Sequence, residues 1–172
     1  MTVVGNTMNV RYRAIPASVP LARHALGDLA AAAGASAEKV EAIRLAVSEA
    51  MTNAVLHAYP QASGIVDVTA AVASGELWVL IADDGRGLHA RSGSPGLGLG
   101  LVLISQEADS FEVGPRGSGG TEVRMRFDLG TRDGEGAREG QRTPEDRWSR
   151  AQLRGSVAAA SRPASARFST TT

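Results

Sequence analysis

The stretch SEAMTNAVLHAYP, residues 48–60, places Glu49, Asn53 and His57 at intervals of four residues. Positions four apart share one face of an α-helix, so these side chains form a polar line along a segment whose other positions are mostly apolar. A buried polar line requires a ligand or a partner, because an unpaired buried polar group is costly. The stretch therefore predicts a helix that carries a binding site.

The elements around this helix are predicted from apolar periodicity and from turn residues. Ser36 is a suitable N-cap and Pro60 follows the last turn, which sets the ends of the helix. Ser74 and Gly75, between two strand-like runs, give the strongest hairpin signal in the chain. The predicted order is a strand over residues 8–15, helices over 18–34 and 36–58, strands over 65–73 and 76–83, a helix over 98–108, and two strands around a Gly-rich turn at 114–120.

This order separates the helices from a mainly antiparallel sheet. It predicts an α+β fold, a two-layer sandwich with the helices on one face of the sheet. The chain contains neither GxxxxGK[ST] nor a strand followed by GxGxxG and a helix within a βαβ unit, so the common phosphate-binding fingerprints are absent. The glycine-rich runs need another explanation.

Composition divides the chain after Leu129. Residues 1–129 are long enough for one domain with a core, whereas residues 130–172 are rich in Gly, Arg, Ser, Thr and Ala and are expected to be a disordered tail. The first part carries 10 basic and 13 acidic residues and the tail carries 8 and 5. This balance gives no concentrated basic face, so direct binding to nucleic acid is not expected.

The sequence also argues against several other classes of protein. No apolar run is long enough to span a membrane and the N-terminus does not resemble an export signal, so a cytoplasmic protein is expected. The absence of cysteine excludes disulfides, thiolate metal sites and thiol catalysis.

Asp83 ends an apolar strand and begins the run DDGRG, residues 83–87. Its carboxylate accepts hydrogen bonds from an exocyclic amine, and Gly85 and Gly87 permit a turn that leaves room for a flat ring. Adenine fits this description, so the run predicts the base-binding part of a nucleotide site.

The run GLGLG, residues 96–100, precedes a predicted helix. Because Gly96, Gly98 and Gly100 lack a Cβ, their backbone N–H groups approach an anion closely, and the helix start adds a favourable dipole. Phosphates fit this place. The amide oxygen of Asn53 is a suitable Mg²⁺ ligand beside them, and Glu49 is a suitable base toward water or a hydroxyl group.

Together these segments resemble the GHKL ATPase superfamily, and most closely the bacterial anti-sigma factor serine-protein kinases of the sporulation and general-stress type. The resemblance covers about residues 8–128. SEAMTNAVLHAY resembles the N box, ADDGRGL the first glycine box, SPGLGLGLVLI the second, and GGTEVRMRF the terminal Gly-Thr strand. It implies a Bergerat-type sandwich that binds ATP and Mg²⁺.

The resemblance also implies a role for each matching position. Glu49 is expected to be the catalytic base, Asn53 the Mg²⁺ ligand and Asp83 the reader of adenine. Thr121 is expected to support Asp83. The glycines expected to act as lid hinges and phosphate contacts are Gly85, Gly87, Gly96, Gly98 and Gly100. Arg23, in VPLARHAL, is the candidate partner contact, although a lone helical arginine is also commonly a solvated surface charge.

Kinases of this family pass the ATP γ-phosphate to a serine of an antagonist protein, hold a sigma factor inactive and are commonly homodimers, so these activities and partners are expected here. The lid between the glycine boxes is shorter than usual, LHARSGSP, in which Arg91, Ser92 and Ser94 are the available phosphate contacts. A catalytically weak or inactive nucleotide-gated binding module is therefore the alternative. A detached ATP-binding domain of a histidine kinase is disfavoured, because no helical hairpin with a phospho-acceptor His is present.

Overall fold

The computed structural model describes residues 2–4, 6–59, 63–87, 97–117 and 119–130, all within one compact unit, Met1–Gly134. Apart from Gly130, the tail predicted over residues 130–172 lies outside the described residues. The elements are β1 (Thr2–Val4), β2 (Thr7–Arg13), α1 (Ser18–Ala32), α2 (Ala37–Asn53), the π-helix η1 (Ala54–Ala58), β3 (Ile65–Ala73), β4 (Glu76–Asp83), α3 (Leu97–Glu107), β5 (Ser110–Pro115) and β6 (Thr121–Asp128).

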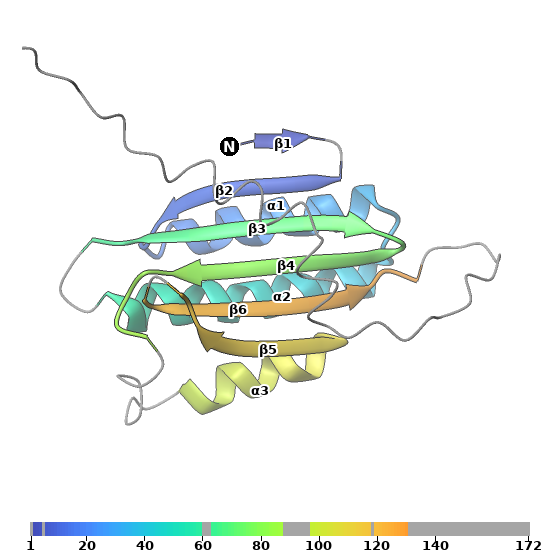
Figure 1. Cartoon of the computed structure of the whole chain (residues 1–172). Coiled ribbons are helices and arrows are strands. Elements are labelled where there is room, and N and C mark those ends of the chain that lie inside the picture. The colour runs from blue at the N-terminus through green and yellow to red at the C-terminus, as the bar shows by residue number, and fades with distance from the viewer. Residues whose placement is uncertain (1, 5, 60–62, 88–96, 118, 131–172) are drawn as a thin grey trace, which may run out of the picture. The chain divides into compact units, whose positions relative to one another are not determined.

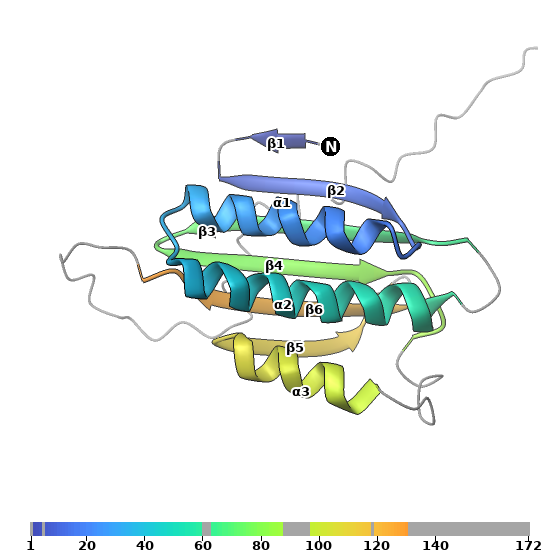
Figure 2. The same cartoon turned by 180° about the vertical axis from the view of Figure 1, so that it is seen from behind.

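The described strands form a six-stranded antiparallel sheet in the order β1-β2-β3-β4-β6-β5. The three α-helices cover one face of this sheet, with α2 across its middle (Figures 1 and 2). The predicted two-layer α+β sandwich is confirmed. The three-residue strand β1 was not predicted, because so short a segment carries no readable alternation.

The core lies between the helices and the sheet and follows from strict alternation along β4. Leu77, Val79 and Ile81 are buried on the helix side, and their partners across β6 are the buried residues Phe127, Met125 and Val123. Ile43, Val47 and Met51 of α2 belong to the same cluster of buried residues. Each such burial stabilises the fold by about 1.5–3 kcal/mol, which holds α2 against β4 and β6.

The predicted hairpin between β3 and β4 is confirmed. Ser74 and Gly75 have φ values of 53° and 74°, and they join the paired residues Ala73 and Glu76. Two successive positive φ values are those of a type I′ turn, whose twist matches the strands that it joins. The turn fixes the register, and Asp83 at the far end of β4 lies opposite Val66.

The helix predicted over residues 36–58 begins as expected but changes form near its end. The Ser36 side chain accepts a hydrogen bond from the Lys39 N–H at 3.2 Å, as an N-cap does. After Asn53 the chain winds as the π-helix η1. A π-turn bonds residue i to i+5, so the four-residue spacing that predicted one polar line does not extend regularly to His57.

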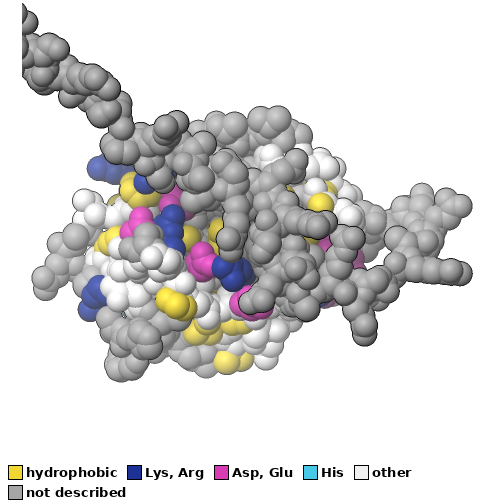
Figure 3. Space-filling view, viewed as in Figure 1, with side chains coloured by type: hydrophobic (Ala, Val, Ile, Leu, Met, Phe, Trp, Pro, Cys, Tyr) yellow, Lys and Arg dark blue, Asp and Glu magenta, His cyan; other side chains and the backbone are white. Residues whose placement is uncertain are grey.

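The sheet face opposite the helices carries charges of both signs (Figure 3). Arg126 pairs with Glu76 at 2.6 Å, and its guanidinium lies 5.9 Å from the centre of the Trp78 ring. Arg116 pairs with Asp67 at 2.8 Å. No helix in the described parts of the chain combines the length and the apolar character needed to cross a bilayer.

The turn before β6 allows a matched test of close packing. Gly119 and Gly120 have φ values of 97° and 85°, but a Cβ at Gly120 would meet the backbone of Asp83, whereas one at Gly119 would meet nothing within 4 Å. We expect Gly119→Ala to lower the free energy of unfolding by about 1–2 kcal/mol from its left-handed backbone alone. Gly120→Ala should cost about 1–3 kcal/mol more, because the Asp83 backbone must move.

Urea denaturation followed by Trp fluorescence measures both free energies of unfolding. Equal losses in the two variants would contradict the close contact between Gly120 and Asp83.

Candidate functional site

Glu49 and Asn53 meet the start of α3 at Gly100. A Cβ on Gly100 would lie 2.9 Å from Glu49 Oε2 and 3.4 Å from Asn53 Nδ2. A side chain at this position would therefore press on the Glu49 carboxylate and touch the Asn53 amide, and glycine lets the start of α3 lie close to these two groups of α2. The structure thus brings together the two predicted motifs at residues 48–60 and 96–100 where they are described.

Asn53 is a buried polar residue whose amide is incompletely paired. Its side chain is 6% exposed, and Nδ2 donates to no acceptor among the described residues. Leaving a buried amide unpaired costs about 1–3 kcal/mol. Rotation of the amide presents either its oxygen or its NH₂ group on the same side. The position is suited to a polar ligand that either atom contacts.

Asp83 and Thr121 form the sheet side of the site. They are cross-strand partners at the ends of β4 and β6, and they are 3% and 1% exposed. Both continue the alternation that turns Ile81 and Val123 toward the helices. The Thr121 hydroxyl is buried and bonds to no described residue, so it forms no direct hydrogen bond with Asp83, and its support of Asp83 stays a prediction.

The chain turns immediately after Asp83. The Gly85 N–H donates to Asp83 Oδ1 at 3.0 Å, which closes a short turn in which a side-chain oxygen takes the place of a carbonyl. A Cβ at Gly85 would lie 2.5 Å from both Cβ and O of Ala58, so this glycine packs directly on η1. The Arg86 N–H donates to the Ala58 carbonyl at 3.2 Å. The predicted base-binding run, residues 83–87, is thus hydrogen-bonded to η1 and packed against it.

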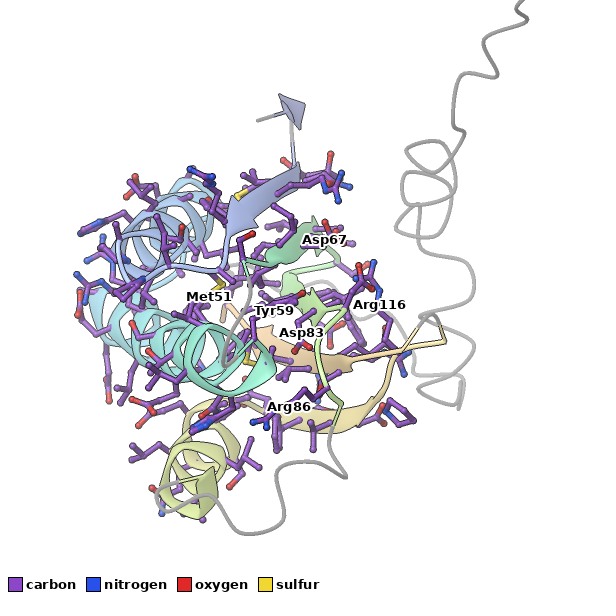
Figure 4. The ribbon with its side chains drawn as sticks, turned by 90° about the vertical axis from the view of Figure 1, so that its left-hand side faces the viewer. Met51, Tyr59, Asp67, Asp83, Arg86 and Arg116 are labelled. Atoms are coloured by element: carbon purple, nitrogen blue, oxygen red, sulfur yellow. The ribbon has the colours of Figure 1, made fainter. Side chains whose placement is uncertain are left out.

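Tyr59 was missed by sequence reasoning, although it lies near Asp83 at the end of the helix layer (Figure 4). Its hydroxyl accepts from the Asp84 N–H at 2.8 Å and donates to the Ile65 carbonyl at 2.8 Å. Burial raises the pKa of Tyr59, the Asp84 hydrogen bond lowers it, and the charges of Asp83 and Asp84 raise it, with a net upward shift. The hydroxyl is therefore protonated at neutral pH and able to donate.

Arg116 was also missed by sequence reasoning. It contacts the turn after Asp83 from the sheet face opposite the helices (Figure 4). One terminal nitrogen lies 2.9 Å from Asp84 Oδ1 and the other donates to Asp67 Oδ2 at 2.8 Å. Burial lowers the pKa of Arg116, but the hydrogen bond to Asp67 and the charges of Asp84, Asp67 and Glu122 raise it above its usual value. Its only sequence signal is a position at the start of a Gly-rich turn.

The remaining predicted residues are less completely placed. Gly87 has a φ of 74°, and a Cβ there would lie 3.4 Å from the Gly120 carbonyl. Gly98 lies in the first turn of α3. Arg23 is half-buried on α1, which packs mainly against α2. Gly96 and the whole short lid, residues 88–95 with Arg91, Ser92 and Ser94, lie outside the described residues.

Comparisons with known proteins agree with this geometry. The model of the family described as histidine kinase-like ATPase domain matches residues 12–127. The anti-sigma F factor of Clostridium acetobutylicum is 25% identical over 132 residues, which cover 70% of this chain and 92% of that protein. The anti-sigma F factor of Caldanaerobacter subterraneus is 26% identical over 136 residues, covering 73% and 95%.

A solved structure shares the fold. The crystal structure of the RsbU and RsbW domains of a Mycobacterium tuberculosis protein matches with a TM-score of 0.58 and 24% identity, over 73% of this chain and 33% of that one. The resemblance to the GHKL ATPases, and to the anti-sigma factors among them, is confirmed. Because the family model covers residues 12–127, the protein belongs to the family of histidine kinase-like ATPase domains.

Proposed function

We propose that this protein is an ATP-binding anti-sigma regulator that phosphorylates a serine of an antagonist protein and sequesters a sigma factor. The observation that carries the proposal is the closeness of Gly100 to Glu49 and Asn53, which brings a carboxylate, an amide and a helix start together. The family membership and the names of the anti-sigma F factor relatives support it.

ATP fits the polar groups at both ends of the site. Asp83, buried at the end of β4, accepts a hydrogen bond from the amine of adenine, and the buried Thr121 hydroxyl beside it gains a partner. The phosphates lie at the start of α3, where backbone N–H groups lack partners within the helix and the dipole favours negative charge. The buried donor of Asn53 and the space that Gly100 leaves support this orientation.

Asn53 also holds the metal. Its amide oxygen is the kind of ligand that Mg²⁺ accepts while it keeps several waters and phosphate oxygens. When bound, Mg²⁺ neutralises the charge that develops on the transferring phosphoryl group. The position of Asn53 on the last turn of α2, with its side chain buried near Gly100, supports this role.

Glu49 acts as the base in the transfer step. Its carboxylate takes the proton of the antagonist's serine hydroxyl while the serine oxygen bonds to the γ-phosphorus. The bond from the γ-phosphorus to the β–γ bridging oxygen breaks, and ADP leaves with that oxygen. The closeness of Glu49 Oε2 to Gly100 supports this role, because the proposed phosphate site lies at the start of α3.

The second candidate is a nucleotide-gated binding module that captures its partners without transferring phosphate. One sequence observation favours it, since only the eight residues LHARSGSP separate the two glycine boxes. A short lid encloses the γ-phosphate less completely, which slows transfer without preventing binding.

Asp83→Asn tests the adenine assignment. The amide replaces one acceptor oxygen with a donor, so the hydrogen bond from adenine to a charged acceptor is lost and ATP should bind about 10- to 100-fold more weakly. Asp109→Asn is the matched control, because Asp109 bonds Lys39 and the Asp128 N–H at the opposite end of β6 from Thr121. Isothermal titration calorimetry with Mg-ATP measures the ATP affinity of both variants. Unchanged affinity in Asp83→Asn would contradict the assignment of Asp83 to adenine.

Glu49→Gln separates the kinase from the binding module. With Mg-ATP and the candidate antagonist proteins encoded beside its gene, wild-type protein should transfer phosphate to a serine. The variant should transfer about 10²- to 10⁴-fold more slowly, because the general base is gone, while it still binds ATP. Glu41→Gln, an exposed position on the same helix, should behave as wild type. Tight binding of an antagonist by the wild type with no transfer would favour the module instead.

A further inference from the structure

The hydroxyl of Tyr59 lies between β3 and the chain that follows β4, at the point where β4 ends. In the register of β3 and β4, Val66 pairs with Asp83, so Ile65 and Asp84 would be the next pair. The Asp84 N–H and the Ile65 carbonyl do not form a hydrogen bond with each other. The phenolic oxygen lies between them, accepting from the Asp84 N–H and donating to the Ile65 carbonyl, each at 2.8 Å. A side chain thus replaces the next bond of an antiparallel ladder.

The opened end of β4 then bonds to the helix layer instead of to β3. The Arg86 N–H donates to the Ala58 carbonyl at 3.2 Å, and the Arg86 guanidinium donates to the His57 carbonyl at 3.3 Å. Among the described residues, the phenol therefore bridges the backbones of β3 and β4 at the position where their direct pairing ends. The chain leaves the sheet immediately after Asp83.

The Tyr59 ring is itself held in place by Gly64. A Cβ on Gly64 would overlap the ring atoms, so the ring lies directly against the backbone at this position. Glycine at 64 therefore lets the phenol reach the gap between β3 and β4.

We propose that Tyr59 is a positioning residue for adenine, which opens the β3–β4 ladder behind Asp83 and so aims the Asp83 carboxylate at the base. The proposal rests on the ATP-binding function proposed above. Without the hydroxyl, the Asp84 N–H and the Ile65 carbonyl pair with each other, β4 lengthens by one residue, and the turn that carries Asp83 and Gly85 shifts. Because the ladder closes on itself, the fold keeps its backbone hydrogen bonds and only the adenine half of the site changes.

Tyr59→Phe tests the proposal by titration with Mg-ATP and, separately, with Mg-tripolyphosphate, which lacks the base. The loss of one well-placed hydrogen-bonded group should weaken ATP binding about three- to tenfold and leave tripolyphosphate binding unchanged. Tyr12→Phe is the matched control, because Tyr12 is a buried tyrosine whose hydroxyl bonds to no other described residue. It should bind both ligands as wild type does.

Gly64→Ala is a second variant that keeps the hydroxyl but pushes the ring out of the gap, so it should show the same selective loss of ATP. Gly117→Ala is its control, because a Cβ there would meet nothing within 4 Å. This pair tests the proposal if Tyr59→Phe fails to fold.

Three results decide between the possibilities. Unchanged ATP affinity in both variants, or equal losses for ATP and tripolyphosphate, would overturn the positioning role while leaving ATP binding in place. Wild-type protein that does not bind ATP would overturn the proposed function, and with it this role.

Discussion

The register between β4 and its two neighbours is the constraint on which the rest of the structure depends. The Ser74-Gly75 turn sets it on one side, and the burial of Leu77, Val79 and Ile81 against the helices maintains it. A slip of one residue would turn all three outward, and it would carry Asp83 to the opposite face. The apolar core therefore determines where the polar end of the strand points, so the site geometry is a consequence of core packing.

The folded chain accepts unpaired buried polar atoms at both halves of the site. Asn53 Nδ2 and Thr121 Oγ1 have no hydrogen-bond partner among the described residues, one from the helix layer and one from the sheet. Arg44 Nε is similarly buried, but its other nitrogens pair with Glu41 and Asp28. Arg116 Nη1 is also buried, and it lies in an ion pair with Asp84. Ion pairs offset part of the cost at the two arginines, whereas the neutral groups of Asn53 and Thr121 form no ion pair and would gain from a polar partner.

Much of this arrangement was predictable from the sequence, because local chemistry and periodicity decide it. The Ser36 cap, the Ser74-Gly75 turn and the alternation along β4 depend on neighbours in the chain, and the structure confirms them. The roles of Glu49, Asn53 and Asp83 remain predictions. Tyr59 and Arg116 were missed because Asp84, to which Tyr59 hydrogen-bonds and with which Arg116 forms an ion pair, lies 25 and 32 positions away from them, and no local pattern records such contacts.

The helical segment that carries Glu49 and Asn53 also contacts the loop that follows Asp83. Glu49 and Asn53 stand on regular α-helix, where a spacing of four keeps them on one face. The next turn, η1, takes an i to i+5 pattern, and its last residue, Ala58, receives the Arg86 N–H and packs on Gly85. The same continuous helical segment therefore carries Glu49 and Asn53 and, at its end, contacts the loop that follows Asp83.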